Sequence, residues 1–593
     1  MATATTEWLL RRVPAFGSLR TYSAEDARAD FVGGLTVAAV AVPQGMAYAL
    51  VAGLPVEYGL YTAIVMTAAG ALFDSSRQLI NGPTNAISIA ILSVLATVQP
   101  DAKVQMAISL ALLVGLIQLG ITLLRLGDLT RFISHSVIVG FTLGAGSLLV
   151  LDQLKNLLGM KAVGDVHAHF VVRFYRSMTE GGGVQPSTAA VGLGTIALVL
   201  ALRWFKKRVG WRLMPDLLMV VIVMAWAVAA FGLEGQNVKT IGAIPARLPT
   251  FAVPALDLEV AREFSTGALA IAVLGLLEAV SMAKAIAAQT KQKLDMNQQC
   301  LSEGVANVTG SFFHCFPGSG SLTRSAINQQ AGGATQWSGV WSAAAVALIM
   351  LVFAPYARYI PRAALAGILM VSAYKMVDWR ALSYHWRATR FDAAIIAATA
   401  ISAVAISVEF CVLIGVLMSF MLTVPRAGRM LLTQFVMTDE GAVHELIPGD
   451  TPCDRILIFG FEGELFFGAA SALEVHFGAI ERQVSERTEF VVLRVKRTRN
   501  PDAVGMTIIE AALDRLAARG VRVVLCGVRP EFHQKLVRTG LLERLREPLF
   551  LEQPVRQTST LLAIRYAYDQ LSSHCGRCPR REAATRGQGY LRI

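Results

Sequence analysis

Two short stretches rich in small and hydroxyl-bearing residues interrupt otherwise apolar parts of this chain. One covers residues 81–88 (NGPTNAIS), and the other covers residues 316–326 (FPGSGSLTRSA). After each break the pattern predicts a helix of about a dozen residues, or about 20 Å at 1.5 Å per residue. A helix N-terminus carries about half a positive charge and N–H groups without intrahelical acceptors. The chemistry that these stretches indicate is therefore the binding of an anion.

The length of these two helices places the breaks. A hydrocarbon core is about 30 Å thick, so neither helix can cross it alone. Each must then start near the middle of the membrane, where irregular backbone survives only against protein or a watery cavity. Two interrupted helices in corresponding halves of a chain indicate the substrate site of a transporter. The pattern predicts a membrane anion transporter.

The anion site would be lined by the first residues of both helices. The candidates are Thr84, Asn85, Ala86, Ser321, Leu322 and Thr323. Their hydroxyl and amide groups would replace part of the anion's hydration shell. The alternative is that small residues merely let neighbouring helices pack closely.

Two charged residues would act at this site. Arg324, also a candidate for binding the anion directly, is expected just behind the site, where it adds positive potential, or where it pairs structurally with a carboxylate or with carbonyl groups. Glu278 lies in an apolar segment, and an ionised carboxylate buried there costs at least several kcal/mol unless it is paired. It is therefore a candidate proton carrier; the alternative is a fixed counter-ion for Arg324.

Charge counting turns this into a coupling hypothesis. Two helix termini plus Arg324 give a charge of about +2, which an ionised Glu278 lowers to about +1. A site with a protonated Glu278 would favour a divalent anion, so proton entry would be coupled to anion uptake.

Composition supports a membrane protein and excludes several other classes. The 593 residues are 54% hydrophobic and only 16% charged, against about 25% charged in soluble proteins. The net charge is +12, but there is no basic patch interleaved with aromatic residues, so nucleic-acid binding is not indicated. No nucleophile–base–acid set, phosphate loop or metal motif appears, so we expect neither an enzyme nor a cofactor. Cys575 and Cys578 with His574 fall short of a four-ligand zinc site.

Apolar runs predict an α-helical polytopic protein of about fourteen segments in two sets of seven, within a transmembrane domain at 31–430. The first set, at ~31–231, has segments at 31–50, 57–73, 84–98, 106–124, 132–150, 188–204 and 214–231. The second, at ~266–424, has segments at 266–286, 302–315, 319–331, 337–354, 361–375, 392–408 and 410–424. Basic loops after the sixth, eighth and twelfth segments place the N-terminal segment, 1–30, in the cytoplasm.

A short internal repeat relates the two sets. Arg131 opens the fifth segment with Gly140 nine residues later, and Arg358 opens the twelfth with Gly367 nine residues later. The offset of seven segments is odd, so the two copies must cross the membrane in opposite directions. Such inverted repeats are typical of secondary transporters.

The last part of the chain alternates between strand and helix patterns, which predicts a small cytoplasmic α/β domain at 441–571. Strands are expected at 455–461, 466–467, 490–495 and 521–525, with a turn at 462–464, and helices at 469–484, 505–519 and 530–538. The tail, 572–593, is expected to be disordered.

The motifs of the membrane region resemble those of the sulfate permease (SulP) family. The similar stretches are residues 43–49 (PQGMAYA), 53–55 (GLP), 58–61 (YGLY), 82–83 and 320–325, and Glu278 matches an acid in the family's eighth segment. The resemblance implies seven plus seven inverted segments in a core and a gate domain, a C-terminal STAS domain, and commonly a homodimer. It also implies that Gln44 and Tyr48, one helical turn apart, face the site; the alternative is polar contact between helices.

The resemblance implies a secondary transporter of small anions in the cytoplasmic membrane, with sulfate first and bicarbonate or dicarboxylates next. Sodium-coupled relatives typically carry Asp at the position of Glu278, so Glu favours a proton as the coupling ion. The alternative is an uncoupled anion channel or an anion exchanger. Residues 500–505 resemble the loop-to-helix switch of STAS domains, but Val504 stands where phosphorylated relatives carry Ser or Thr. The domain is then expected to serve folding, dimer contacts or partner docking.

Overall fold

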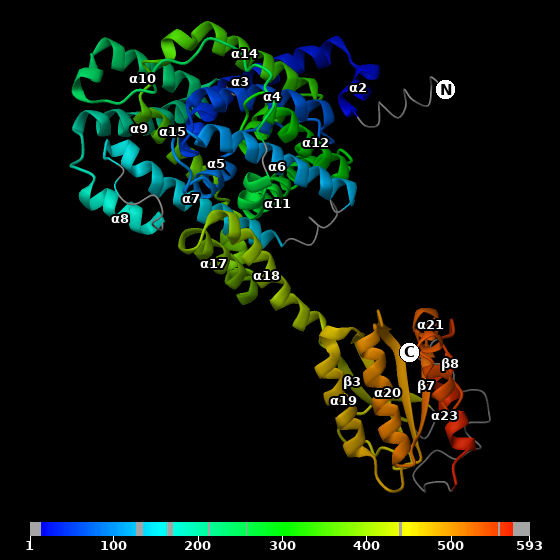
Figure 1. Ribbon diagram of the computed structural model, residues 1–593. Helices are drawn as coiled ribbons and strands as arrows, with labels where there is room; N and C mark the ends of the chain where they lie inside the picture. The colour runs from blue at the N-terminus through cyan, green and yellow to red at the C-terminus, as the bar shows by residue number, and fades with distance from the viewer. Residues whose placement is uncertain are drawn as a thin grey trace. The chain divides into compact units, whose positions relative to one another are not determined.

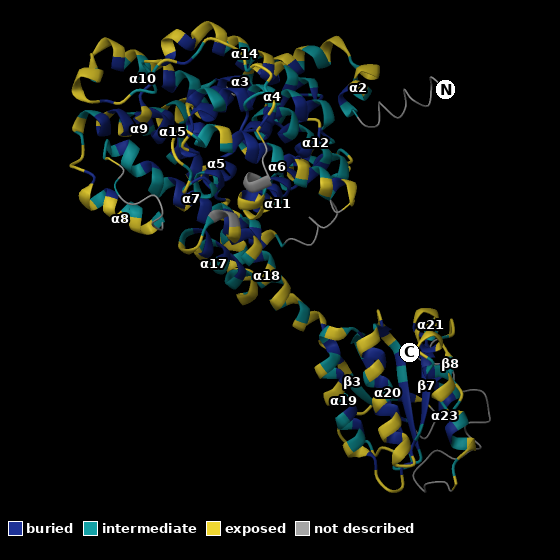
Figure 2. Cartoon of the chain, viewed as in Figure 1, coloured by how far each residue is buried: buried dark blue, intermediate teal, exposed yellow. Residues whose placement is uncertain are grey.

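The computed structural model describes residues 13–125, 134–161, 163, 170–210, 214–255, 258–437, 442–555 and 558–572. The chain forms two compact units, Met1–Ser419 and Phe420–Ile593. The first is helical, and the second is an α/β unit (Figure 1). Each unit has its own interior of buried residues beneath exposed outer faces (Figure 2).

Each of the fourteen predicted segments corresponds to a helix. The first seven are α3 (Ala24–Val51), α4 (Val56–Phe73), α5 (Asn85–Val94), α6 (Lys103–Leu123), α7 (His135–Leu158), α9 (Pro186–Val209) and α10 (Asp216–Ala230). The last seven are α11 (Leu258–Thr290), α12 (Met296–Ser311), α13 (Leu322–Gln330), α14 (Trp337–Ala357), α15 (Arg362–Met376), α17 (Arg390–Ala405) and α18 (Val408–Ala427). Within the described residues, eight helices are long and apolar enough to cross a membrane.

The packing of these helices follows an inverted repeat. By their order in the two sets of seven, α3, α4 and α6 correspond to α11, α12 and α14. In one bundle α3 and α4 both pack on α14, and their counterparts α11 and α12 both pack on α6. In the other bundle α7 packs on α17 as α15 packs on α9. A Cβ on Gly140 would lie 2.7 Å from the Ile396 carbonyl oxygen, and one on Gly367 would lie 3.0 Å from that of Gly192. The repeated glycines thus permit equivalent close contacts; residues 131–133 of the motif lie outside the described part.

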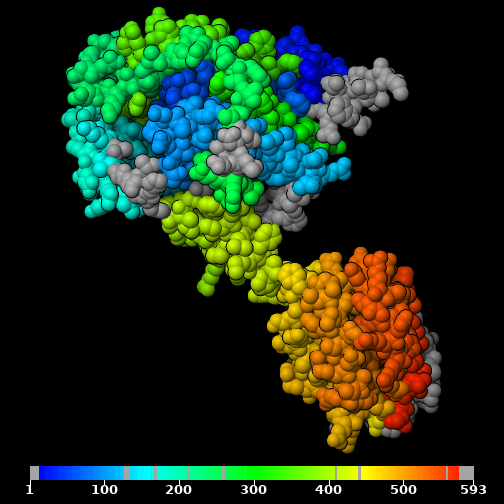
Figure 3. All heavy atoms as spheres, viewed as in Figure 1, coloured from blue at the N-terminus to red at the C-terminus, as the bar shows by residue number. Residues whose placement is uncertain are grey.

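One helix boundary and three short helices differ from expectation. The first long helix begins at Ala24 rather than near residue 31, because Ser23 and Asp26 form a capping box that starts it among charged residues. Three short helices were not predicted: α2 (Pro14–Ser18), α8 (Phe170–Glu180) and α16 (Trp379–Ala388). The last two are amphipathic, with polar and apolar residues alternating along each helix, so a search for apolar runs passes over them. Helix α8 lies on the surface of the first unit (Figure 3).

The second unit is built on a six-stranded sheet in the order β4-β3-β5-β6-β7-β8. The strands are β3 (Leu431–Met437), β4 (Val443–Glu445), β5 (Ile456–Glu464), β6 (Phe490–Arg499), β7 (Arg522–Val528) and β8 (Phe550–Leu551). β5 to β8 run parallel, as strand–helix alternation predicts, and β3 and β4 add an antiparallel edge. Helices α19 (Ala470–Gln483), α20 (Ala503–Ala518) and α21 (Pro530–Arg538) cover one face, and α23 (Thr558–Asp569) covers the other.

Two predictions in this unit were wrong. The predicted turn at 462–464 lies inside β5, because Glu462 and Gly463 pair with Arg497 and Thr498 of β6 across a register shift. Consequently no strand forms at 466–467; a 3-10 turn, Phe467–Ala469, leads into α19 instead. The sheet also starts earlier than the expected boundary at 441, with β3. Residues 573–593, including Cys575 and Cys578, lie outside the described residues.

Candidate functional site

The two breaks lie side by side as a short antiparallel pair. Strand β1 (Asn81–Gly82) pairs with β2 (Ser319–Gly320), with Asn81 opposite Gly320. One residue further on, the Ser321 N–H donates to the Ile80 carbonyl at 2.9 Å. The pairing brings the N-terminus of α5 next to that of α13. Two segments that are about 240 positions apart in sequence thus form one site.

The irregular backbone at the crossing is held by polar side chains. The Thr67 hydroxyl donates to the Asn81 carbonyl at 2.6 Å, and the Ser319 hydroxyl donates to the Gly275 carbonyl at 2.8 Å. The Asn307 amide oxygen accepts from the Gly318 N–H at 3.0 Å. Because backbone polar groups at membrane depth must be satisfied by protein or water, these bonds stabilise the breaks.

The helices that start at the breaks are too short to cross a bilayer. α5 has 10 residues and α13 has 9. At 1.5 Å per residue they measure about 15 Å and about 14 Å, against about 30 Å for a hydrocarbon core. They are slightly shorter than the predicted dozen residues, which strengthens the inference that both begin within the membrane.

At the N-terminus of α5, the Thr84 side chain makes two hydrogen bonds. Its Oγ1 accepts from the Ile87 N–H at 3.4 Å, as an N-cap, and donates to the Glu278 Oε2 at 3.0 Å. The next residue, Asn85, is buried, and its amide nitrogen lies 3.6 Å from the Met376 Sδ of α15. Ala86 is also buried. Thr84 therefore connects the first turn of α5 to the Glu278 carboxyl group.

At the N-terminus of α13 the side chains differ in exposure. Ser321 is buried, Thr323 is half-buried and Leu322 is 38% exposed. The Thr323 hydroxyl lies 3.5 Å from the Gln44 Oε1, since α3 packs on α13. Tyr48, one turn further along α3, is buried where it interacts electrostatically with Arg324 and Glu278. The α3 face with Gln44 and Tyr48 thus adjoins the crossing.

Arg324 links the two breaks. Its side chain is 1% exposed, and its Nη2 donates to the Pro83 carbonyl at 2.8 Å. Of the roles left open by the sequence, this contact is the one with a carbonyl group. A Cβ on Gly82, whose φ is +139°, would lie 2.8 Å from the Arg324 Nη1, so glycine is required beside the guanidinium.

Glu278 reaches the crossing from α11. Its side chain is half-buried, its Oε2 accepts from Thr84, and it interacts electrostatically with Arg324. The Glu278 carboxyl group therefore accepts from the N-cap residue of α5. Its negative charge also offsets the positive charge of Arg324, which donates to the Pro83 carbonyl. A change in the protonation of Glu278 would change both the potential and the hydrogen bonding at the helix terminus.

A set of buried polar residues behind the breaks was not predicted from the sequence. It consists of Thr67, Asp74, Gln118, Gln299, Ser302, Glu303 and Asn307. The available signal was the spacing of Gln299, Glu303 and Asn307, which recur every four residues and so share one face of α12.

Replacing Arg324 by Ala is expected to raise the KM for anion uptake by about 10- to 100-fold. A hydrogen bond to a charged group contributes about 1.5–3 kcal/mol, and about 1.4 kcal/mol corresponds to a tenfold change. Lys retains the charge but not the fork of donors, so R324K should fall between wild type and R324A. The matched control is R362A, since Arg362 also donates to a carbonyl, that of Thr240, but at an exposed position. Equal KM values in R324A and R362A would contradict this role.

The chain is similar to known proteins along most of its length. The model of the Sulfate permease family matches residues 28–399, and that of the STAS domain matches residues 452–554. The chain is 29% identical to Sulfate transporter 4.1, chloroplastic, of Arabidopsis thaliana, over 92% of this chain and 82% of the relative. It is 31% identical to the Sodium-independent sulfate anion transporter of Bos taurus, over 65% of this chain and 68% of the relative.

Solved structures show the same fold. The murine Solute Carrier 26 family member A9 anion transporter, in the inward-facing state, superposes with a TM-score of 0.86 at 19% identity, covering 95% of each chain. The transmembrane domain of a cyanobacterial bicarbonate transporter, BicA, superposes with a TM-score of 0.57 at 25% identity, covering 67% of this chain and 98% of that one.

Proposed function

The chain belongs to the sulfate permease family, and on that premise we propose that it is a secondary active transporter that takes up sulfate first, and bicarbonate or dicarboxylates next, coupled to protons. Anion transport across a membrane is the activity of this family, whose members are transporters and not enzymes. The preference for sulfate is supported by the sulfate transporters among its relatives, and bicarbonate is supported by the likeness to BicA.

The pairing of β1 with β2 is the observation that carries the proposal. It joins two helix N-termini, which together carry about one elementary positive charge and so attract an anion. Arg324 adds a further positive charge directly behind them. The anion would be held by first-turn N–H groups of α5 and α13, by the hydroxyl of Thr323 and by the amide of Gln44. The remaining predicted residues, Tyr48, Thr84, Asn85, Ala86, Ser321 and Leu322, would shape the site.

Glu278 is the proposed coupling group. Ionised, it offsets part of the positive charge that the anion requires; protonated, it leaves a charge of about +2 at the site. A divalent anion and a proton therefore favour each other's binding, which is the thermodynamic condition for symport. The hydrogen bond from Thr84 gives the carboxyl group a direct connection to the helix that binds the anion.

The remaining features are proposed from charge and family resemblance. Basic loops support a cytoplasmic position for the N-terminus and the STAS domain, and the protein is proposed to lie in the cytoplasmic membrane. We propose a homodimer in which the STAS domain serves folding, dimer contacts or docking. Asp502 caps α20 through the Gly505 N–H at 2.8 Å, and Val504 between them is 43% exposed but offers no hydroxyl for phosphorylation.

Purified protein in proteoliposomes is expected to accumulate labelled sulfate against its gradient when an inward proton gradient is imposed. An uncoupler should abolish the accumulation, because the driving force is the proton gradient. Competition by bicarbonate, chloride, succinate and fumarate at two pH values would rank the substrates. Uptake that only equilibrates sulfate would indicate a channel, and uptake that requires an internal anion would indicate an exchanger; either result would contradict symport.

A further inference from the structure

A second carboxyl group is buried in the first unit without a partner. The side chain of Glu303, on α12, is 0% exposed. Neither of its carboxyl oxygens has a hydrogen-bond partner among the described residues. A buried charge without a partner costs several kcal/mol or more, and a protonated carboxyl group avoids most of that cost. The position is therefore suited to holding a proton.

Asp74, at the end of α4, provides the contrast within the same cluster. It is equally buried, but its carboxylate accepts from the Gln299 amide at 2.6 Å, the Ser302 hydroxyl at 2.7 Å and the Asn81 amide at 3.1 Å. Hydrogen bonds to a carboxylate favour its charged form. Asp74 thus has three donors that favour its charged form, whereas the Glu303 carboxyl has none among the described residues, so Glu303 is the better suited of the two acids to hold a proton.

Glu303 lies between this cluster and the anion site. Gln299, Glu303 and Asn307 are four residues apart on α12, which places them about 6 Å apart along one face of the helix. At the inner end, the Asn307 amide donates to the Gly318 carbonyl at 3.2 Å and to the Gln118 Oε1 at 3.0 Å. Gly318 directly precedes β2, so this polar face runs to the crossing. The charged groups that act on Glu303 are Asp74 and Glu278, and α6 contributes the neutral Gln118.

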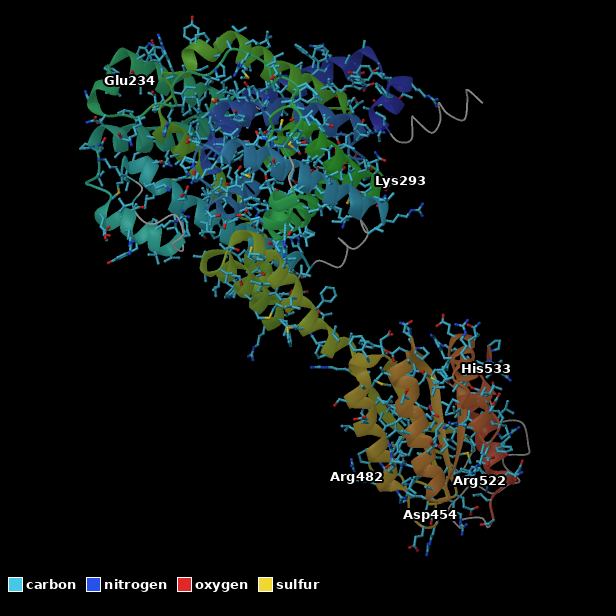
Figure 4. All side chains as sticks on the ribbon, in the orientation of Figure 1. Glu234, Lys293, Asp454, Arg482, Arg522 and His533 are labelled. Carbon is cyan, nitrogen blue, oxygen red and sulfur yellow. The ribbon has the colours of Figure 1, made fainter. Side chains whose placement is uncertain are left out.

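The other end of the polar face reaches the surface. The N-terminus of α12 is tied to the loop after α4, since the Asp295 N–H donates to the Ser75 hydroxyl at 2.8 Å. Lys293, just before α12, lies at the surface of the first unit (Figure 4). Basic Lys291 and Lys293 place this end in the cytoplasm in the proposed orientation. The face thus extends from the anion site to the cytoplasmic end of α12.

We propose that Glu303 is a second proton-binding site, which takes the proton released by Glu278 and passes it toward the cytoplasm. Glu303 first releases the proton that it holds toward the cytoplasm and becomes a carboxylate. It then takes the proton of the Glu278 carboxyl, so that Glu303 is neutral again and Glu278 is left as a carboxylate. Because the two carboxylates repel each other, a proton shared between them is favoured over two charges. This inference rests on the proton coupling proposed above.

The test is to separate net uptake from exchange. In proteoliposomes, E303Q should lower the initial rate of proton-driven sulfate uptake by about tenfold or more, since a positioned proton-transfer group contributes about 10²–10⁴-fold. Exchange of labelled for unlabelled sulfate at equal pH moves no net proton, so it should stay within about twofold of wild type. E303D, which restores a titratable carboxyl, should recover part of the net uptake. Cys300→Ala, a buried change on the same helix, is the matched control.

Each outcome has one meaning. Net uptake by E303Q equal to that of wild type would overturn the inference while leaving symport through Glu278 intact. Equal losses of net uptake and of exchange would overturn it too, because they would show a structural role. A wild-type protein whose uptake ignores the proton gradient would overturn the proposed coupling itself.

Discussion

Replacing Glu278 by Gln is expected to abolish concentrative, proton-driven uptake, with a loss of at least about tenfold in initial rate. Gln has nearly the same shape and keeps an oxygen that can accept from the Thr84 hydroxyl, so the cap of α5 should survive. What it removes is the ability to bind and release a proton. The variant is therefore expected to fold, to bind sulfate and to exchange it, but not to accumulate it.

The charge of Glu278 also predicts the direction in which uptake changes with pH. In the wild-type protein, sulfate uptake should rise as the external pH falls, because a protonated Glu278 leaves the more positive site that a divalent anion favours. In E278Q the site is permanently neutral at this position, so uptake should become nearly independent of external pH. Initial rates of labelled sulfate uptake over a range of external pH measure the effect.

Asp392 offers the matched control for Glu278. It lies near the start of α17, where the Ser136 hydroxyl donates to it at 2.6 Å and the Thr389 hydroxyl donates to it at 2.7 Å. These bonds agree with a structural, capping role, so D392N should keep the pH dependence of the wild type. Uptake by E278Q that still rises as the external pH falls, with D392N unchanged, would exclude Glu278 as the coupling group.

The breaks could be predicted from the sequence because their cause is local. Gly82, Pro83 and the glycines of 318–320 interrupt an apolar pattern, and membrane thickness then limits where the following helices can start. That the two breaks are adjacent follows from the inverted repeat, which puts them at corresponding positions of two crossing halves. The interrupted apolar pattern and the internal repeat were therefore sufficient to predict the two breaks and their adjacency.

The partners of the charged residues could not be predicted, because they depend on three-dimensional packing. The sequence offers Arg324 a carboxylate, a carbonyl or the anion, and only the register of β1 with β2 places the Pro83 carbonyl within 2.8 Å. Likewise, Asp74 and Glu303 are both acids within the predicted transmembrane domain. The donors that distinguish them, on Gln299, Ser302 and Asn81, come from segments far apart in the chain.

Replacing Gly318 by Ala is expected to reduce sulfate uptake by about 10- to 100-fold. A Cβ at this position would lie 2.5 Å from the carbonyl oxygen of Gly82 and 2.8 Å from its carbonyl carbon. Both are backbone atoms of the paired segment, so relief requires the two breaks to move apart. A displacement of about 1 Å between groups that bind one reactant commonly costs about 10²-fold.

The control for Gly318 is a glycine that can accept a methyl group. A Cβ on Gly120, near the end of α6, would have no neighbouring atom within 4 Å, and Ala is favoured over Gly in a helix by about 1 kcal/mol. G120A should therefore transport like the wild type. If G318A also transported sulfate at the wild-type rate, the contact between the breaks would not hold the anion site together. If instead G318A lost uptake while it remained monodisperse in detergent and kept its melting temperature within a few degrees, the loss would come from the separation of two helix N-termini, since neither charge nor hydrogen-bonding side chain had changed.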